Sequence, residues 1–147
     1  MVQLRFGSVD IPTTWDVRMQ LELRAPAVVV EGPKTARQKS VPTPGPNIIL
    51  RRGPAPKPDA VACAQDLLTQ LAAAVPGLRA QPVDTTRFVD GTEGATVEVA
   101  FDTPQTTVHQ RHVFRLDGPV LTHGCASAAD PKALAAVLPV LLSFTPS

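Results

Sequence analysis

Cysteine is scarce in this chain, with only Cys63 and Cys125 among 147 residues. Two cysteines form at most one bridge, which excludes the disulfide framework that holds many small secreted domains together. Such sparing use of cysteine is typical of a reducing compartment. The first fifteen residues, MVQLRFGSVDIPTTW, carry no apolar run behind a basic start and therefore do not resemble a signal peptide. We expect a cytoplasmic protein.

Long apolar runs and an excess of one charge are also lacking. No window approaches the roughly 18 apolar residues that a membrane-spanning helix needs, so we expect no direct membrane insertion. Fourteen Lys and Arg face 13 Asp and Glu, a net charge of +1. No general field therefore steers the protein toward nucleic acid, and we expect no nucleic-acid partner. The length suits one domain with one real core, residues 1–147.

The sequence has no recognisable catalytic motif. The run DGTEG, residues 90–94, indicates a turn between strands rather than a phosphate-binding loop, because no helix follows it. The serines of the chain lie in none of the sequence motifs that activate a serine nucleophile. The acidic residues do not form the paired carboxylates of hydrolases. We therefore expect a protein that is not an enzyme and needs no cofactor.

Alternating apolar and polar residues predict most of the strands. The pattern is clear in VQLRF (2–6) and VRMQLELR (17–24), and NIILRR (47–52) resumes it. Between them, residues 31–46 are rich in proline and glycine, which predicts a loop. Four more strands are expected over 78–88, 95–102, 107–116 and 120–127.

Helical spacing of apolar residues predicts two helices. The first covers Ala60–Val75, with Asp59 as its N-cap, and PG stops it. The second covers Pro131–Phe144, with Asp130 as N-cap and a proline at the first helical position. Pro139 should kink or tighten this second helix.

These elements predict an α+β fold with an antiparallel six- to seven-stranded sheet. The apolar residues of 17–23 and of 97–101 each alternate with polar ones. We therefore expect one face of the sheet to be core, with two helices packed on that one face, and the other face to meet solvent.

A histidine-bearing hairpin is expected over VHQRHVFRLDGPVLTHGC, residues 108–125. Asp117-Gly118 is a dipeptide favoured at the centre of a two-residue hairpin turn. That turn would place His112 opposite His123 and Gln110 opposite Cys125, all on one face. Strand alternation would send the third histidine of this stretch to the other face.

The cluster expected from this hairpin contains His112, His123 and Cys125. Cross-strand neighbours lie about 5 Å apart, close enough for two imidazoles to share a zinc ion. A zinc site needs a third and usually a fourth ligand, and nothing at a recognisable spacing supplies one. We expect no bound metal and a polar strip on the sheet; binding of a small ligand or metal stays open as an alternative.

The order and spacing of five segments resemble the DcrB-like family, which has the Mog1/PsbP-like fold. The segments are VDIPTTWDV, NIILRR, LLTQLAAAVPGLR, VHQRHVFRLDGPVLTHGCAS and LLSF. Small cytosolic members of that family resemble the Eag chaperones of type VI secretion. Those chaperones are typically dimers whose concave sheet face shields the N-terminal transmembrane helices of an effector. The family's strand Arg-Gln-x-aromatic matches residues 111–114, with His112 in place of the usual glutamine.

The resemblance implies a homodimer that binds the hydrophobic N-terminal region of an effector protein. A generic Mog1-like protein-binding module unrelated to secretion is the main alternative, with its contact at strand edges or at the basic loop over 34–39. For the effector chaperone we expect the partner to meet the polar face of the sheet. The residues expected there are Gln20, Glu22, Glu98, Gln110 and His112.

Overall fold

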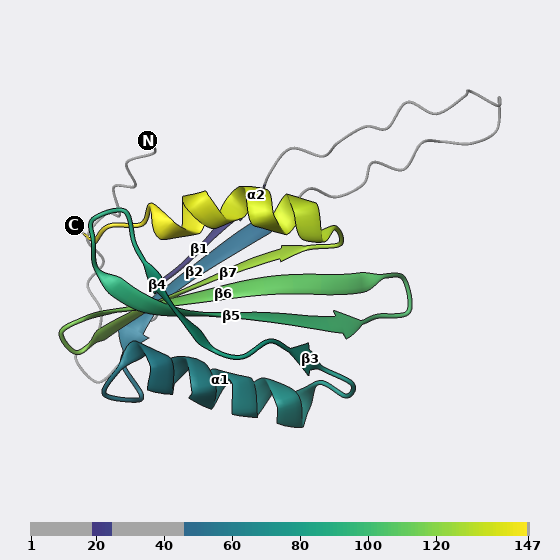
Figure 1. Ribbon diagram of the computed structural model, residues 1–147, viewed down its shortest axis with the longest axis horizontal. Coiled ribbons are helices and arrows are strands. Elements are labelled where there is room, and N and C mark those ends of the chain that lie inside the picture. Colours follow the sequence, from purple (N-terminus) through teal and green to yellow (C-terminus); the bar gives the residue numbers. More distant parts are fainter. Residues whose placement is uncertain (1–18, 25–45, 147) are drawn as a thin grey trace.

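The computed structural model of this chain describes residues 19–24 and 46–146. Within them, seven strands form one sheet and two helices pack against it (Figure 1). In chain order the elements are β1 (Met19–Arg24), β2 (Asn47–Pro54), α1 (Ala60–Ala74), β3 (Arg79–Ala80), β4 (Asp84–Arg87), β5 (Glu93–Asp102), β6 (Thr107–Asp117), β7 (Val120–Ala128) and α2 (Pro131–Leu142).

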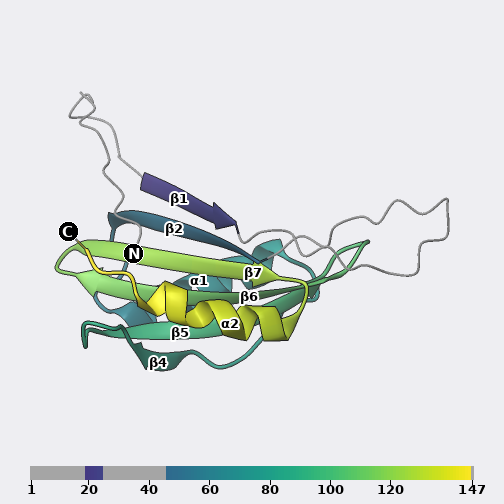
Figure 2. The same ribbon diagram turned by 90° about the horizontal axis from the view of Figure 1, so that it is seen from above.

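The strands follow the order β1-β2-β7-β6-β5-β3, and β4 also pairs with β5. Every neighbouring pair is antiparallel. Figure 2 shows β1 at one edge of the sheet. The predicted α+β class and antiparallel sheet are confirmed. The strand predicted over 2–6 and nearly all of the loop predicted over 31–46 lie outside the described residues.

Both helices begin where the sequence predicts, because an aspartate caps each of them. Asp59 accepts a hydrogen bond from the backbone N–H of Ala62 at 2.8 Å, and Asp130 accepts one from the N–H of Lys132 at 2.9 Å. Pro139 lies inside α2, which continues beyond it to Leu142.

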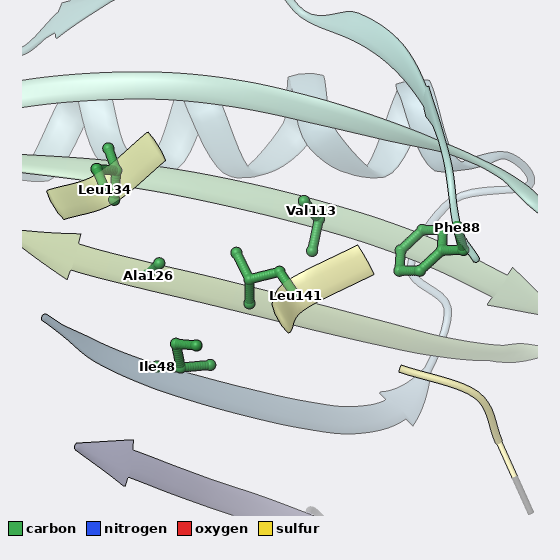
Figure 3. Packing of buried hydrophobic residues seen from close by; sticks show 6 residues of the cluster. All are labelled: Ile48, Phe88, Val113, Ala126, Leu134 and Leu141. Atoms are coloured by element: carbon green, nitrogen blue, oxygen red, sulfur yellow. The ribbon is translucent and has the colours of Figure 1, made fainter. Parts of the chain in front are cut away.

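The two helices cover opposite faces of the sheet, so the prediction that both pack on one face is wrong. Figure 1 shows α2 on one side of the strands and α1 on the other. Val113 and Phe114 are consecutive on β6 and therefore point to opposite faces. Val113 packs in the cluster under α2, which is drawn in Figure 3, with Ile48, Phe88, Ala126, Leu134 and Leu141. Phe114 packs under α1 with Cys63, Ala64, Ala95, Val97 and Val99.

The pairing register of the strands explains why the helices do not share one face. Leu21 pairs with Leu50, Leu50 with Gly124, and Gly124 with Val113, so this row of positions belongs to the α2 side. Val97, in contrast, belongs to the α1 side. Strand positions 21 and 97 therefore lie in rows that belong to different sides of the sheet, and both sides hold a core.

Candidate functional site

The site is built on the hairpin of β6 and β7, whose turn differs from the predicted one. Asp117 pairs with Val120, so Gly118 and Pro119 are the two central residues. Gly118 has φ +59°, while the proline ring holds the next φ negative. This combination is typical of a type II′ turn.

The turn shifts the predicted pairing by two residues and leaves the faces unchanged. His112 pairs with Cys125 rather than with His123, and Gln110 pairs with Ser127 rather than with Cys125. A shift of two keeps each side chain on its predicted face because the strand period is two. We call these five residues the polar cluster: Gln110, His112, His123, Cys125 and Ser127.

Side-chain hydrogen bonds link four members of the polar cluster into a chain. The Gln110 amide nitrogen donates to Ser127 Oγ at 3.1 Å, and its carbonyl oxygen lies 3.1 Å from His112 Nε2. His112 Nδ1 lies 2.9 Å from His123 Nε2. The Gln110 carbonyl can only accept, so His112 Nε2 carries a hydrogen, and the neutral ring then has a bare Nδ1 that accepts from His123 Nε2.

Aromatic stacking holds both imidazoles in place. The His123 ring lies between Phe114 and His112, with centroid distances of 4.8 Å and 5.1 Å and an angle of 11° between planes in each pair. His112 is only 4% exposed. Such burial fixes the ring positions that the hydrogen-bond chain requires.

Burial also keeps both histidines neutral. It lowers the pKa of His112 from 6.5 to about 4, and the positive charge of Arg51 acts in the same direction. It lowers the pKa of His123 to about 3, with smaller contributions from His112 and Arg51. At neutral pH the cluster therefore offers uncharged imidazoles.

Cys125 is the fifth member of the polar cluster. Burial raises the pKa of the Cys125 thiol, which keeps it protonated at neutral pH. The Cys125 sulfur lies 3.9 Å from His112 Nε2, the nitrogen already hydrogen-bonded to Gln110. In the described ranges 19–24 and 46–146, no group of three or more His, Cys, Asp or Glu side chains could hold a metal ion.

The polar cluster lies on the α1 side, beside the part of the sheet that α1 covers. α1 packs mainly on β5 and β6. Toward β2, the ladder places Asn47 next to Ser127, Ile49 next to Cys125 and Arg51 next to His123. Asn47 and Ile49 are half-buried and Arg51 is exposed. This half of the face combines apolar and hydrogen-bonding side chains.

Two of the five residues predicted to contact a partner, Gln110 and His112, belong to the polar cluster, and the backbone of two more lies in the same rows of the sheet. Gln20 and Glu22 pair on β1 with Arg51 and Ile49, in line with the polar cluster that holds the other two, Gln110 and His112. Glu98 does not share their face. Its carboxylate binds Arg111 at 2.7 Å on the α2 side, so the prediction of one common face is wrong for Glu98.

Sequence reasoning missed two contributors to this site. Ser127 was considered only as a nucleophile, yet its hydroxyl ends the hydrogen-bond chain. Arg51 was not considered, yet it lies across from His123 and its charge disfavours protonation of both imidazoles. Ser127 could have been found by extending the face assignment along β7. Arg51 depends on the β2–β7 pairing, which no local signal predicts.

Comparison with solved structures identifies proteins of the same fold, among them one that covers most of this chain. No family model and no curated protein matches the chain. The crystal structure of PA94 from Pseudomonas aeruginosa, described as a protein of unknown function and suggested to be a regulator, superposes with a TM-score of 0.66. The identity is 16%, over 93% of this chain and 89% of that one. The likeness shows the fold alone. Within the described residues, no helix has the length and apolar character required to cross a bilayer.

The neutral histidine pair predicts a stability that falls in acid. Both folded-state pKa values lie below the ordinary 6.5, so below pH 6.5 the unfolded chain binds more protons than the folded one. Stability should be full above that value and fall as the pH drops toward about 4. Between pH 7.5 and about pH 5 we expect a loss of about 4 kcal/mol, about 2 kcal/mol for each of the two histidines.

Urea denaturation at the two pH values measures this loss. Its control is the double variant His112→Gln/His123→Gln, which keeps amide hydrogen-bonding groups and cannot titrate. The variant should lose less stability than the wild type on acidification. Equal losses in the two proteins would assign the acid sensitivity to other groups.

Proposed function

We propose that this chain is a non-catalytic, cytoplasmic binding protein that shields the hydrophobic N-terminal segment of a type VI secretion effector, acting as a homodimer. The resemblance of its segments to the DcrB-like family and the Eag chaperones suggests this class of partner. The α1-side face around the polar cluster is the proposed docking surface.

One observation carries the proposal: α1 packs mainly on β5 and β6, while half-buried apolar and polar side chains continue across β7 to β2. Ile49 and Cys125 supply apolar contact there, and Asn47, Gln110 and Ser127 supply hydrogen-bonding groups. A mixed surface of this kind fits an apolar segment that carries a few polar groups. Such a segment needs its apolar surface covered and its polar groups matched until it is released.

The chemistry of the cluster favours binding over catalysis. A protonated thiol and two neutral, stacked imidazoles hold fixed positions without producing a strong nucleophile or base. A generic protein-binding module would instead bind its partner at strand edges or at the basic loop predicted over 34–39. The partner distinguishes the two roles, because only the chaperone requires an apolar segment.

Capture of an effector segment tests the proposal. The protein is co-expressed with the apolar N-terminal segment of an effector encoded beside it, and the complex is isolated through a tag on that segment. Gln110→Ala removes a half-buried hydrogen-bonding group from this surface and should weaken capture about fivefold or more, since one hydrogen bond to the partner contributes about 1 kcal/mol.

Glu98→Ala is the matched control, because Glu98 lies on the α2 side. It should leave capture unchanged while both variants keep the wild-type melting temperature within a few degrees. Undiminished capture by Gln110→Ala would remove this face from the binding site. Failure of every apolar segment to co-purify would favour the generic binding module.

A further inference from the structure

His123 Nδ1 is the one ring nitrogen of the histidine pair that the hydrogen-bond chain leaves unused. The chain occupies His123 Nε2 and both nitrogens of His112. In the described part of the protein, Nδ1 of His123 has no hydrogen-bond partner. The fully buried polar side-chain atoms that lack a partner there are Arg52 Nε and Thr122 Oγ1. Nδ1 of His123 is not among them, and the His123 residue is half-buried rather than buried.

The order of donors and acceptors along the hydrogen-bond chain decides whether His123 Nδ1 is a donor or an acceptor. Gln110 donates its amide hydrogen to Ser127 and accepts from His112 Nε2. His112 Nδ1 must then accept, and His123 Nε2 must donate to it across 2.9 Å. A neutral His123 that carries its hydrogen on Nε2 has a lone pair on Nδ1. This atom is therefore an acceptor.

Arg51 is the cation whose charge lowers the pKa of both imidazoles of the pair. From β2, Arg51 faces His123 and its positive charge opposes an added proton. From β7, the Cys125 thiol is uncharged. On β1, the ladder places Glu22 next to Ile49, in the row that includes Cys125 and His112. On β5, the neighbour of His112 is the apolar Val97.

We propose that His123 Nδ1 is a specificity-determining acceptor that recognises an O–H or N–H donor carried by an otherwise apolar partner segment. Serine, threonine or asparagine within such a segment has the required chemistry. The inference rests on the proposed function for the apolar character of the partner. The identity of the recognised group comes from the hydrogen-bond chain.

Protonation would remove this property in a defined way. The first added proton can only enter at His123 Nδ1, because the other three ring nitrogens are hydrogen-bonded. The bridging hydrogen can then move from His123 Nε2 to His112 Nδ1, so that the pair holds a single charge as one unit. In either arrangement Nδ1 of His123 becomes a donor and can no longer accept.

The free protein provides the first test. Long-range proton–nitrogen NMR on uniformly labelled protein at pH 7.5 should show both His112 and His123 as neutral rings with hydrogen on Nε2. Assignment uses His112→Gln and His123→Gln. A hydrogen on Nδ1 of His123, or a charged ring at that pH, would overturn the proposal regardless of any partner.

Two synthetic peptides provide the second test. Both are helices of about 20 leucine and alanine residues, and one has a central serine where the other has alanine. The wild type should bind the serine peptide about fivefold more tightly, the factor for one hydrogen bond of about 1 kcal/mol. His123→Phe should abolish this preference, whereas His123→Gln, whose amide oxygen can accept, should restore part of it.

The outcomes separate the two proposals. Equal affinity of the wild type for the two peptides would overturn the acceptor role and leave the shielding of apolar segments intact. Binding of neither peptide would overturn both proposals. A preference that persists in His123→Phe would place the recognised contact elsewhere on the face.

Discussion

Replacing Gly94 with alanine is expected to destabilise the fold by more than about 3 kcal/mol, the upper range for overpacking a core. A β-carbon at this position would collide with the backbone carbonyl oxygen of Phe114 and would lie 2.7 Å from a ring carbon of Phe88. The phenyl ring can turn only within the core under α2. The carbonyl belongs to β6, next to the paired strand β5, and cannot retreat without breaking the ladder.

Gly53→Ala is the matched control for this substitution. Gly53 also lies in a strand, β2, but nothing lies within 4 Å of a β-carbon built there, and its φ is not in the left-handed region. Its free energy of unfolding should change by less than about 0.5 kcal/mol, as for most sites without special packing. Thermal or urea unfolding of both variants decides the matter. A Gly94→Ala protein as stable as Gly53→Ala would contradict the packing described for β5 and β6.

Local signals in the sequence predict most elements of this fold, but the single strand expected over 78–88 is two short strands, β3 and β4. The N-caps Asp59 and Asp130 fix the beginnings of both helices, and turn residues separate the strands. Local signals do not fix which faces of distant strands coincide. Val113 and Phe114 are both apolar, and such a pair is consistent with helices on one face or on both. The relative faces of β1 and β5 depend on four ladders: β1–β2, β2–β7, β7–β6 and β6–β5. Each of these ladders requires pairing that local sequence does not specify.

The candidate site shows the same division. The face of the histidines follows from strand alternation and was predicted. The neighbours of His112 were not, because Asp117-Gly118 and Gly118-Pro119 are both acceptable turn centres in the sequence. In the observed turn the Asp117 side chain binds Arg115 of the same strand, and the Arg115 guanidinium also binds Asp90 in the turn after β4. Turn preference alone does not choose between the two turn centres. The observed one occurs together with the tertiary contact of Arg115.

Arg115 connects three separate segments of the chain. Its guanidinium binds both carboxylate oxygens of Asp90, in the turn after β4, at 2.9 and 2.6 Å. It also binds Asp117 at 2.9 Å and donates to the backbone carbonyl of Phe144 at 3.3 Å. The Arg115 side chain is 3% exposed, and the Phe88 ring lies 5.3 Å beneath it. These contacts hold the pKa of Asp90 well below its usual range.

Arg115→Leu is therefore expected to reduce the free energy of unfolding by about 3 kcal/mol, the lower range for removing one partner of a buried ion pair. Leucine fills part of the space but leaves Asp90 and Asp117 without their cation and the Phe144 carbonyl without its donor. Arg115→Lys should recover less than half of the loss, because one ammonium cannot reproduce paired, planar contacts to two carboxylates.

Arg87→Ala is the control for charge alone. Arg87 forms an ion pair of 3.1 Å with Glu93 between β4 and β5, and their side chains are 67% and 78% exposed. Water already solvates both groups, so the loss of this pair should change stability by less than about 1 kcal/mol. Urea denaturation of the Arg115 and Arg87 variants side by side compares a buried ion-pair network with an exposed pair near the same sheet edge. Equal small losses would mean that the fold tolerates uncompensated Asp90 and Asp117, and that Arg115 does not hold these segments together.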